Sequence, residues 1–139
     1  MFGWMIEIQD NLMKKYNTRD PYLLCDYLGV NVFHEDLGNM FGFFNSTKRI
    51  KMIHINMHIT DQEQKFTCAH ELQHAIFHAN INTPFLNEHT LLSVNKIEMQ
   101  ANFLATRLLI EDKKIYERKI DVLNYYGIPL EMEKFYDFL

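Results

Sequence analysis

The chain has 139 residues, of which 47% are hydrophobic and 23% charged, and its formal net charge at pH 7 is −4. This length and composition are typical of one globular domain with its own hydrophobic core, so we expect a single domain spanning residues 1–139. The slight negative charge argues against a broad basic surface for nucleic acid or anionic membranes. No apolar run approaches the roughly 18 residues of a membrane span. Two cysteines are too few for a disulfide scaffold, and the first residues show no secretory signal, so we expect a cytoplasmic protein.

The first two predicted elements are helices. Apolar residues three and four apart predict a helix over residues 4–16. A second, shorter helix is predicted over residues 22–28. Asp20 can cap its N-terminus, Pro21 suits its first position, and Gly29 suits the position after its last turn.

The sequence pattern then changes to that of β-strands. Residues 30–33 alternate between apolar and polar side chains, and a turn signal at residues 45–48 separates two further segments, 40–44 and 49–55. Because a short turn joins these two segments, we expect them to pair antiparallel. The expected fold class is therefore α+β, with a small, mainly antiparallel sheet of about three strands packed against helices.

A third helix is predicted to begin at a capping box. The Thr60 side chain can accept a hydrogen bond from the backbone of Glu63, whose carboxylate can return to the backbone of Thr60. The apolar spacing extends this helix to about Ala79 and predicts that one of its faces is buried. The elements expected after it are a loop that contains Pro84, a long helix over about 95–110, and a helical C-terminal tail over about 111–139 that breaks at 127–129.

The third helix carries an H-E-x-x-H motif, His70-Glu71-Leu72-Gln73-His74. Helix residues four apart are offset by only about 40°, so His70 and His74 can share one metal ion. Imidazole nitrogens suit zinc. Glu71 is turned by about 100° from His70, where it is better placed to reach a water at the metal than to bind the metal itself. This is the position of a general base.

A zinc site of this kind needs a third protein ligand, for which the candidates are His78, His89 and Glu98. His78 would spread three ligands over about 12 Å of one helix axis, which is too far for one ion. We therefore expect His78 to lie beside the site, or to be a structural histidine. Glu98 is the preferred third ligand, and Asn102, four residues later, would then hold a histidine N–H. The alternative for Glu98 is a solvated helix residue.

These motifs resemble those of the ImmA/IrrE family of metallopeptidases. Residues 66–78 are similar to its active-site helix, and residues 98–105 to its second motif, in which a glutamate followed by Ala-Asn or Ala-Asp supplies a metal ligand. The likeness extends to the helix at 20–22 and the strand at 53–56. It departs at Gln73, where the family commonly has glycine, and at residues 108–111, where Leu-Leu-Ile-Glu replaces Leu-Leu-Met-Pro.

The resemblance implies a zinc-dependent endopeptidase of the gluzincin kind with a zincin-like fold. Carried over by position, His70, His74 and Glu98 would hold one Zn²⁺ ion, and Glu71 would be the general base. The substrate is expected to add as a strand to a sheet edge, for which residues 53–56 are the candidate. A second group that stabilises the oxyanion is also expected, and the sequence does not choose among its candidates, which are His78, His89, Tyr116, Tyr125 and Tyr126.

Members of this family typically cleave repressors that carry helix-turn-helix domains. The resemblance therefore implies a protein substrate, a helix-turn-helix repressor of a phage or mobile element, and no direct contact with nucleic acid or membrane. A different possibility is a metal-binding regulator that relieves repression by binding the repressor without proteolysis. A deformylase-like hydrolase is disfavoured because the chain lacks the Gly-Cys motif that supplies that class with its third ligand. A structural domain with a chance motif is the remaining alternative.

Overall fold

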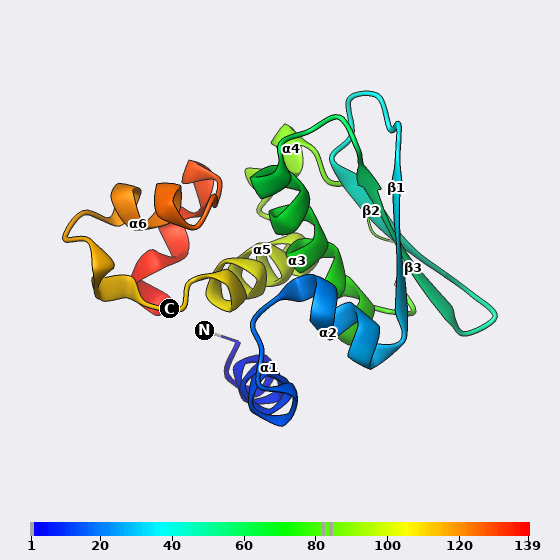
Figure 1. Cartoon of the computed structure of the whole chain (residues 1–139), viewed down its shortest axis with the longest axis horizontal. Helices are drawn as coiled ribbons and strands as arrows, with labels where there is room; N and C mark the ends of the chain where they lie inside the picture. Colours follow the sequence, from blue (N-terminus) through cyan, green and yellow to red (C-terminus); the bar gives the residue numbers. More distant parts are fainter. Residues whose placement is uncertain (1, 82, 84) are drawn as a thin grey trace.

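The computed structural model describes residues 2–81, 83 and 85–139, so Pro84 in the predicted loop lies outside the described residues. The fold is α+β, as expected, with helices and a small sheet in one layered body (Figure 1). The elements in chain order are α1 (Gly3–Tyr16), α2 (Pro21–Leu28), β1 (Val30–Glu35), β2 (Gly42–Thr47), β3 (Ile50–Asn56), α3 (Asp61–Phe77), α4 (Glu88–Leu91), α5 (Lys96–Leu109), η1 (Lys113–Ile115), α6 (Lys119–Tyr125) and η2 (Leu130–Phe138).

The capping residues define the helix ends as predicted. Asp20 accepts a hydrogen bond from the Tyr22 backbone at 2.9 Å and begins α2. Thr60 and Glu63 form both halves of the capping box at the start of α3, and Asn95 caps α5. In the described parts of the chain, no helix is long and apolar enough to cross a membrane.

The sheet has the predicted number of strands in the order β1-β3-β2. β2 and β3 pair antiparallel, as expected for neighbours joined by a short turn, whereas β1 pairs parallel with β3. The sheet is therefore mixed. Because β3 is the central strand, the prediction that residues 53–56 form an open edge is wrong. Local patterning cannot show which strand a third strand will join, and the two edges are β1 and β2.

The turn between β2 and β3 also differs from the prediction. The sequence signal covers residues 45–48, but the two turn residues are Lys48 and Arg49, with φ of 50° and 69°. Positive φ at both central residues is the conformation of a type I′ hairpin turn, whose twist matches that of the flanking strands. The chain adopts it here without the glycine or asparagine that usually marks it, so the position of the turn has little signal in the residues themselves.

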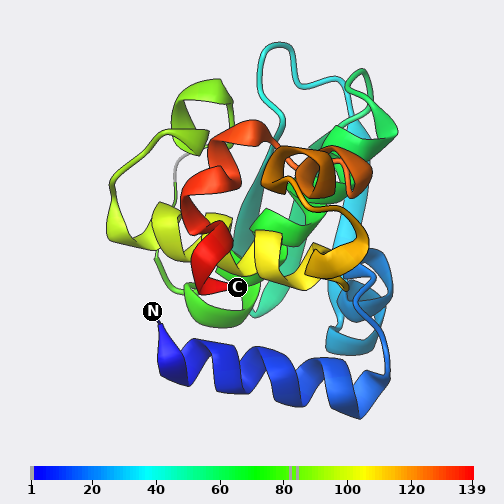
Figure 2. The ribbon, with the colours of Figure 1, turned by 90° about the vertical axis from the view of Figure 1, so that its left-hand side faces the viewer.

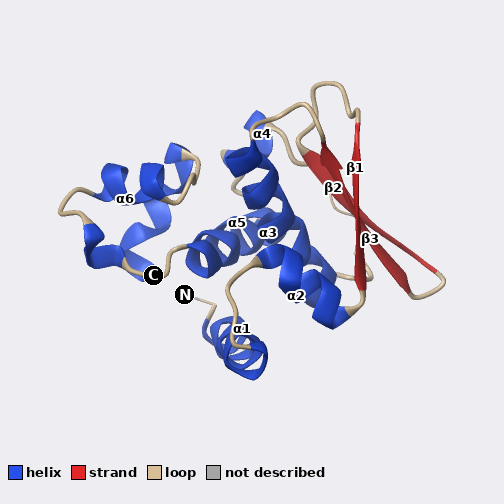
Figure 3. Cartoon of the chain, in the orientation of Figure 1, coloured by secondary structure: helices blue, strands red, loops and turns tan. Residues whose placement is uncertain are grey.

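Helix α3 runs through the middle of the molecule (Figure 1). One side faces the sheet and α2, and the other faces α5. Every residue from Phe66 to Ala75 is buried, so the expectation of a single buried face is wrong. The far face of the sheet carries no helix in the described structure (Figure 3). The histidines of the H-E-x-x-H motif therefore lie inside the fold, between α3 and α5.

The C-terminal tail consists of short helical pieces that break at Gly127–Pro129, as predicted. It lies on the side of α5 opposite the sheet, and α1 crosses one end of the molecule (Figures 1 and 2). The tail side chains that enter the core are fully or nearly buried; these are Val122, Leu123, Ile128, Met132, Phe135 and Tyr136. The tail thus packs against α5 on the side that faces away from the sheet.

Candidate metal centre

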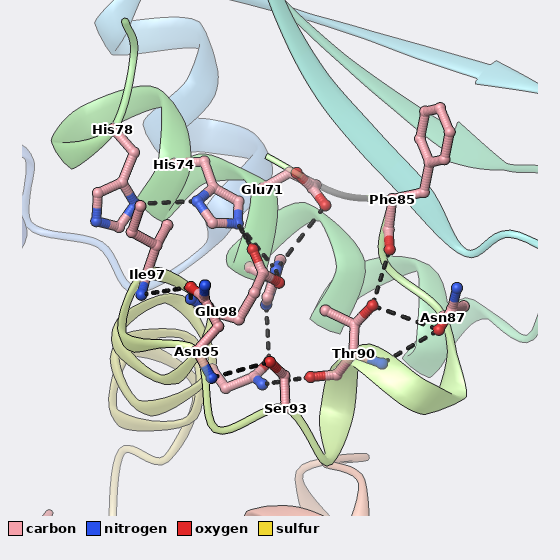
Figure 4. A network of polar contacts seen from close by, with 12 residues as sticks. Glu71, His74, His78, Phe85, Asn87, Thr90, Ser93, Asn95, Ile97 and Glu98 are labelled. Carbon is pink, nitrogen blue, oxygen red and sulfur yellow. Dashed lines mark hydrogen bonds and ion pairs between the residues drawn. The ribbon is translucent and has the colours of Figure 1, made fainter. Parts of the chain in front are cut away.

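Two helices bring three potential metal ligands together. His70 and His74 lie on α3, and Glu98 lies in the first turn of α5. Figure 4 shows His74 and Glu98 pointing toward one another. All three side chains are at most 1% exposed. The alternative of a solvated Glu98 is therefore wrong. Asn95 positions the glutamate, because its side chain caps the helix and fixes where α5 begins.

The spacing of the donor atoms fits one metal ion. The Nε2 atoms of His70 and His74 are 3.2 Å apart, and they lie 3.3 and 2.9 Å from the two carboxylate oxygens of Glu98. Donor atoms around a tetrahedral zinc ion with bonds of about 2.0–2.1 Å are about 3.3–3.4 Å apart. Two imidazoles and one carboxylate also form a known donor set for catalytic zinc. The residues present therefore fit a zinc ion.

The surroundings of the three candidate ligands shift the pKa of each side chain. Burial lowers the pKa of His74 to about 4, despite its contact with Glu98, so that this imidazole is neutral at pH 7. Burial alone would raise the pKa of Glu98, but the contacts with His70 and His74 outweigh burial and hold it at about 2. Burial also opposes charge on His70, yet Glu98, Glu71 and Asn102 together leave its pKa above the usual value. Without metal, His70 therefore releases its second proton at a higher pH than a free imidazole does.

Glu71 occupies a different environment from the three candidate ligands. Its carboxylate lies 4.0 Å from the Nε2 atom of His70 and is completely buried. Neither of its oxygens has a hydrogen-bond partner among the described residues. Burial raises the pKa of Glu71 to about 8, with Glu98 adding to the effect and His70 opposing it. A buried carboxylate without a partner is costly to the fold, and such groups are common in catalytic sites.

Asn102 makes the contact that the sequence suggests. Its Oδ1 atom is 2.8 Å from Nδ1 of His70, and its amide nitrogen donates to the backbone oxygen of Thr90 at 3.2 Å. The donation to Thr90 orients the amide so that its oxygen faces His70. The proton of His70 then sits on Nδ1, which leaves the Nε2 lone pair directed at the space between the ligands.

His78 lies beside His74 and outside the group of converging donor atoms. Its Nδ1 atom is 2.9 Å from Nδ1 of His74, and its Nε2 atom is 2.8 Å from Oε1 of Gln100. Sequence reasoning placed His78 near the site but missed Gln100. No local signal identifies this glutamine, because its contact depends on how α5 packs across the end of α3.

Residues 85–93, within the connection between α3 and α5, lie beside Glu98; we refer to them as the covering segment. The Leu86 N–H donates to the backbone oxygen of Gly42 at 2.9 Å, and the Leu86 oxygen accepts from the Phe41 N–H at 2.8 Å. The Thr90 hydroxyl donates to the backbone oxygen of Phe85. An open cleft of about 530 Å³ leads along this segment to Glu98. The residues that line it are Phe85, Asn87, His89, Thr90, Ser93 and Glu98. Figure 4 labels all of these except His89.

The remaining candidates for the group that stabilises the oxyanion lie in different parts of the molecule. His89 is exposed on α4 and shares the cleft with Glu98. Tyr126 lies elsewhere, where its hydroxyl accepts a hydrogen bond from the backbone of Asp112. Tyr116 and Tyr125 are exposed and contact each other in the tail. A larger hollow, of about 660 Å³, lies between α1 and the start of α2, and it contains none of the histidines or carboxylates of the site.

The fold and the site together define a class: an α+β protein with an H-E-x-x-H helix and a glutamate on a second helix. Comparison with known proteins gives the family. The model for peptidase M78, described as the IrrE N-terminal-like domain, matches residues 25–135. The chain therefore belongs to this family, and the expected ImmA/IrrE membership is confirmed.

Two relatives extend over most of the chain. The uncharacterized immunity region protein 2 of Bacillus phage phi105 is 41% identical over 130 residues, which cover 87% of this chain and 81% of the phage protein. The metallopeptidase ImmA of Bacillus subtilis (strain 168) is 29% identical over 129 residues, which cover 86% of this chain and 75% of ImmA. These relationships support a metallopeptidase role in phage immunity.

Proposed function

We propose that this protein is a zinc-dependent endopeptidase in which His70, His74 and Glu98 hold the metal and Glu71 is the general base. The observation that carries the proposal is the convergence of two Nε2 atoms and a carboxylate, 2.9–3.3 Å apart, beside a buried carboxylate with no partner. Membership of a peptidase family supports the same chemistry.

Glu71 takes a proton from the attacking water and then passes it to the amine that leaves. When bound, a zinc ion supplies Lewis-acid polarisation of the peptide carbonyl and makes water easier to deprotonate. The pKa of about 8 belongs to Glu71 in the metal-free site. A cation held by the three ligands favours the charged carboxylate and lowers that pKa, so Glu71 can act as a base near neutral pH.

His89 is our candidate for the group that stabilises the oxyanion. Of the five residues considered from the sequence, it is the one that lines the cleft leading to Glu98. His78 is committed to His74 and Gln100 by both ring nitrogens. The side chain of His89 is exposed and can turn towards a bound peptide, whereas the three tyrosines belong to the tail.

The edge of β2 is our candidate for the strand that a substrate joins. The type I′ turn makes Thr47 and Ile50 a hydrogen-bonded pair, so alternation along β2 directs the backbone groups of Phe44 and Ser46 away from β3. A hollow of about 550 Å³ lies along this part of the edge, opposite residues 79–81 and 83. An extended peptide can pair there by main-chain hydrogen bonds.

The substrate that we propose is a helix-turn-helix repressor of a phage or mobile element, recognised through protein contacts in the cytoplasm. The similarity to an immunity region protein of a phage and to ImmA supports this choice. The net charge of −4 supports recognition of the protein rather than of its DNA.

The decisive experiment compares wild-type protein with Glu71→Gln in cleavage of the repressor encoded next to its gene. We expect zinc-loaded wild type to cleave the repressor, and Glu71→Gln to lose at least a thousandfold in rate while it still binds zinc. Glu117→Gln is the matched control, because Glu117 is an exposed glutamate of the tail.

The alternative, a regulator that sequesters the repressor, predicts a different result. In that case wild type and Glu71→Gln relieve repression equally and the repressor remains intact. Absence of stoichiometric zinc from folded wild-type protein would count against the metal site itself.

A further inference from the structure

The contacts of His78 extend the metal site by two residues that bind no metal. His78 lies between His74 and Gln100, at 2.9 and 2.8 Å, and the His78 and Gln100 side chains are only 4% and 7% exposed. Gln100 comes from α5, two residues after Glu98. Helix α5 therefore contributes a candidate ligand and, separately, the end of a hydrogen-bond chain that reaches His74 from its other side.

The hydrogen-bond series from Gln100 through His78 to His74 requires each imidazole to carry its proton on one particular ring nitrogen. His74 directs Nε2 towards His70 and Glu98, so metal binding requires the His74 proton to be on Nδ1. His78 must then accept at its own Nδ1 and carry its proton on Nε2. That proton needs an acceptor, and the Oε1 atom of Gln100 is at hydrogen-bond distance from it.

Without this oxygen the opposite arrangement becomes available. His78 can then carry its proton on Nδ1 and donate it to Nδ1 of His74, whose own proton moves to Nε2. A proton on that atom occupies the lone pair that a metal needs. For His70 no second histidine lies in between, because Asn102 contacts its Nδ1 atom directly. The two histidines thus depend on different amide side chains of α5.

The local backbone explains how His78 reaches this position. Its backbone N–H still donates to the oxygen of His74 at 2.8 Å, but its φ of −131° and ψ of 30° end α3 at this residue. The side chain is therefore not held to the direction of a continuing helix. It lies alongside His74 and faces the start of α5.

We propose that His78 and Gln100 are positioning residues that fix the tautomer of His74 and thereby set the zinc affinity of the site. The inference rests on the proposed zinc site, but it concerns hydrogen bonding behind a ligand and not proteolysis. Hydrogen bonds to the outer nitrogen of a ligating histidine typically contribute 10–100-fold to metal affinity.

The test measures zinc dissociation constants of the purified full chain by competition with a chromophoric chelator. Gln100→Leu keeps the size of the side chain but removes the acceptor, and we expect its dissociation constant to rise by at least tenfold. Gln100→Glu retains an acceptor and should stay within about threefold of wild type. Gln73→Leu is the matched control: Gln73 is also buried, but its amide donates to the backbone oxygen of Ala69 on its own helix.

A second readout does not depend on any variant folding. In zinc-loaded, ¹⁵N-histidine-labelled wild type, two-bond ¹H–¹⁵N correlations should show the His78 proton on Nε2. A His78 proton on Nδ1, or equal zinc affinity of Gln100→Leu and wild type, would overturn the inference while leaving the zinc site intact. Wild type that binds no zinc would overturn the proposed function, and this inference with it.

Discussion

The residues of the site combine features that are unfavourable for a protein core. His70 and His74 are at most 1% exposed, and each lies within 4.0 Å of a carboxylate that is equally buried, Glu71 or Glu98. Glu98 is compensated by His70 and His74, at 3.3 and 2.9 Å. Glu71 has no comparable compensation. The structure thus keeps one carboxylate available at the expense of stability, as is common where a residue serves chemistry more than folding.

The first prediction concerns the stability of the metal-free protein. The pKa of Glu71 is about 8 in the fold, against an ordinary value of 4.5, so its stabilising contribution is complete below pH 4.5 and is lost as the pH rises through 8. Glu71→Gln removes this loss. We expect the variant to exceed wild type by several kcal/mol in unfolding free energy at pH 9 and by little at pH 5.

Urea unfolding with a chelator present, at pH 5, 7 and 9, measures this difference. Glu117→Gln controls for the loss of one carboxylate at an exposed position. Parallel pH profiles for wild type and Glu71→Gln would show that burial does not raise the Glu71 pKa as described.

The second prediction is that zinc affinity increases with pH. Although burial opposes charge on His70, its neighbours raise its pKa above the usual value, so metal-free protein keeps a proton there to higher pH than a free imidazole does. Zinc must displace that proton, and release of one proton strengthens binding by about tenfold per pH unit below the pKa. Dissociation constants at pH 6, 7 and 8 should therefore fall as pH rises. His58→Gln, at an exposed histidine, should leave the slope unchanged, whereas a flat profile for wild type would contradict the prediction.

At the scale of secondary structure, the covering segment connects the site to the sheet. Leu86 is fully buried and pairs with Gly42 by an isolated bridge at one end of β2. Glu71 is also fully buried, so a peptide can reach it only if part of the structure moves. One bridge is much weaker than the continuous ladder between β2 and β3, and local opening is therefore less costly here than in the sheet.

The third prediction follows from this difference. The Leu86 amide, although bonded to the Gly42 oxygen at 2.9 Å, should exchange with deuterium at least a hundredfold faster than the amide of Ile53 in central β3. Native-state hydrogen exchange measured by NMR provides both rates in one sample. Equal protection of the two amides would mean that the covering segment opens only with the whole fold, and that substrate enters by another route.

The sequence could specify those elements whose signals are local. Asp20, Thr60 and Asn95 each cap a helix, and a cap depends only on residues within one turn of it. The H-E-x-x-H spacing is also local, because the helix itself places both histidines on one side. These signals are sufficient for the helices and for two of the donor atoms.

Features that depend on contacts between distant elements were not predictable in the same way. The central place of β3 results from parallel pairing with β1, and no residue in either strand encodes that choice. The contact of Gln100 with His78 needs the packing of α5 against the end of α3. The turn at Lys48 and Arg49 was misplaced because neither residue is typical of positive φ.

At the scale of the whole molecule, the C-terminal tail packs against α5, the helix that carries Glu98, Gln100 and Asn102. Phe103, next to Asn102 on α5, meets Phe135 of the tail edge to face, with ring centroids 5.7 Å apart. On its other side, α5 packs against α3. The helix that carries Glu98 and Asn102 is therefore packed between α3 and the tail, which makes residues 111–139 part of the structural support of the site.

The fourth prediction tests this support with two phenylalanines of the tail. Phe135 is 2% exposed, and Phe138, three residues later, is 55% exposed. Phe135→Ala should lower the unfolding free energy by about 3–5 kcal/mol through lost burial and the cavity that remains, whereas Phe138→Ala should cost less than about 1 kcal/mol. Because the cavity lies directly behind α5, Phe135→Ala should also weaken zinc binding in the fraction that stays folded. Urea unfolding and chelator competition measure the two effects, and an equal loss of stability in both variants would show that the tail is not part of the core.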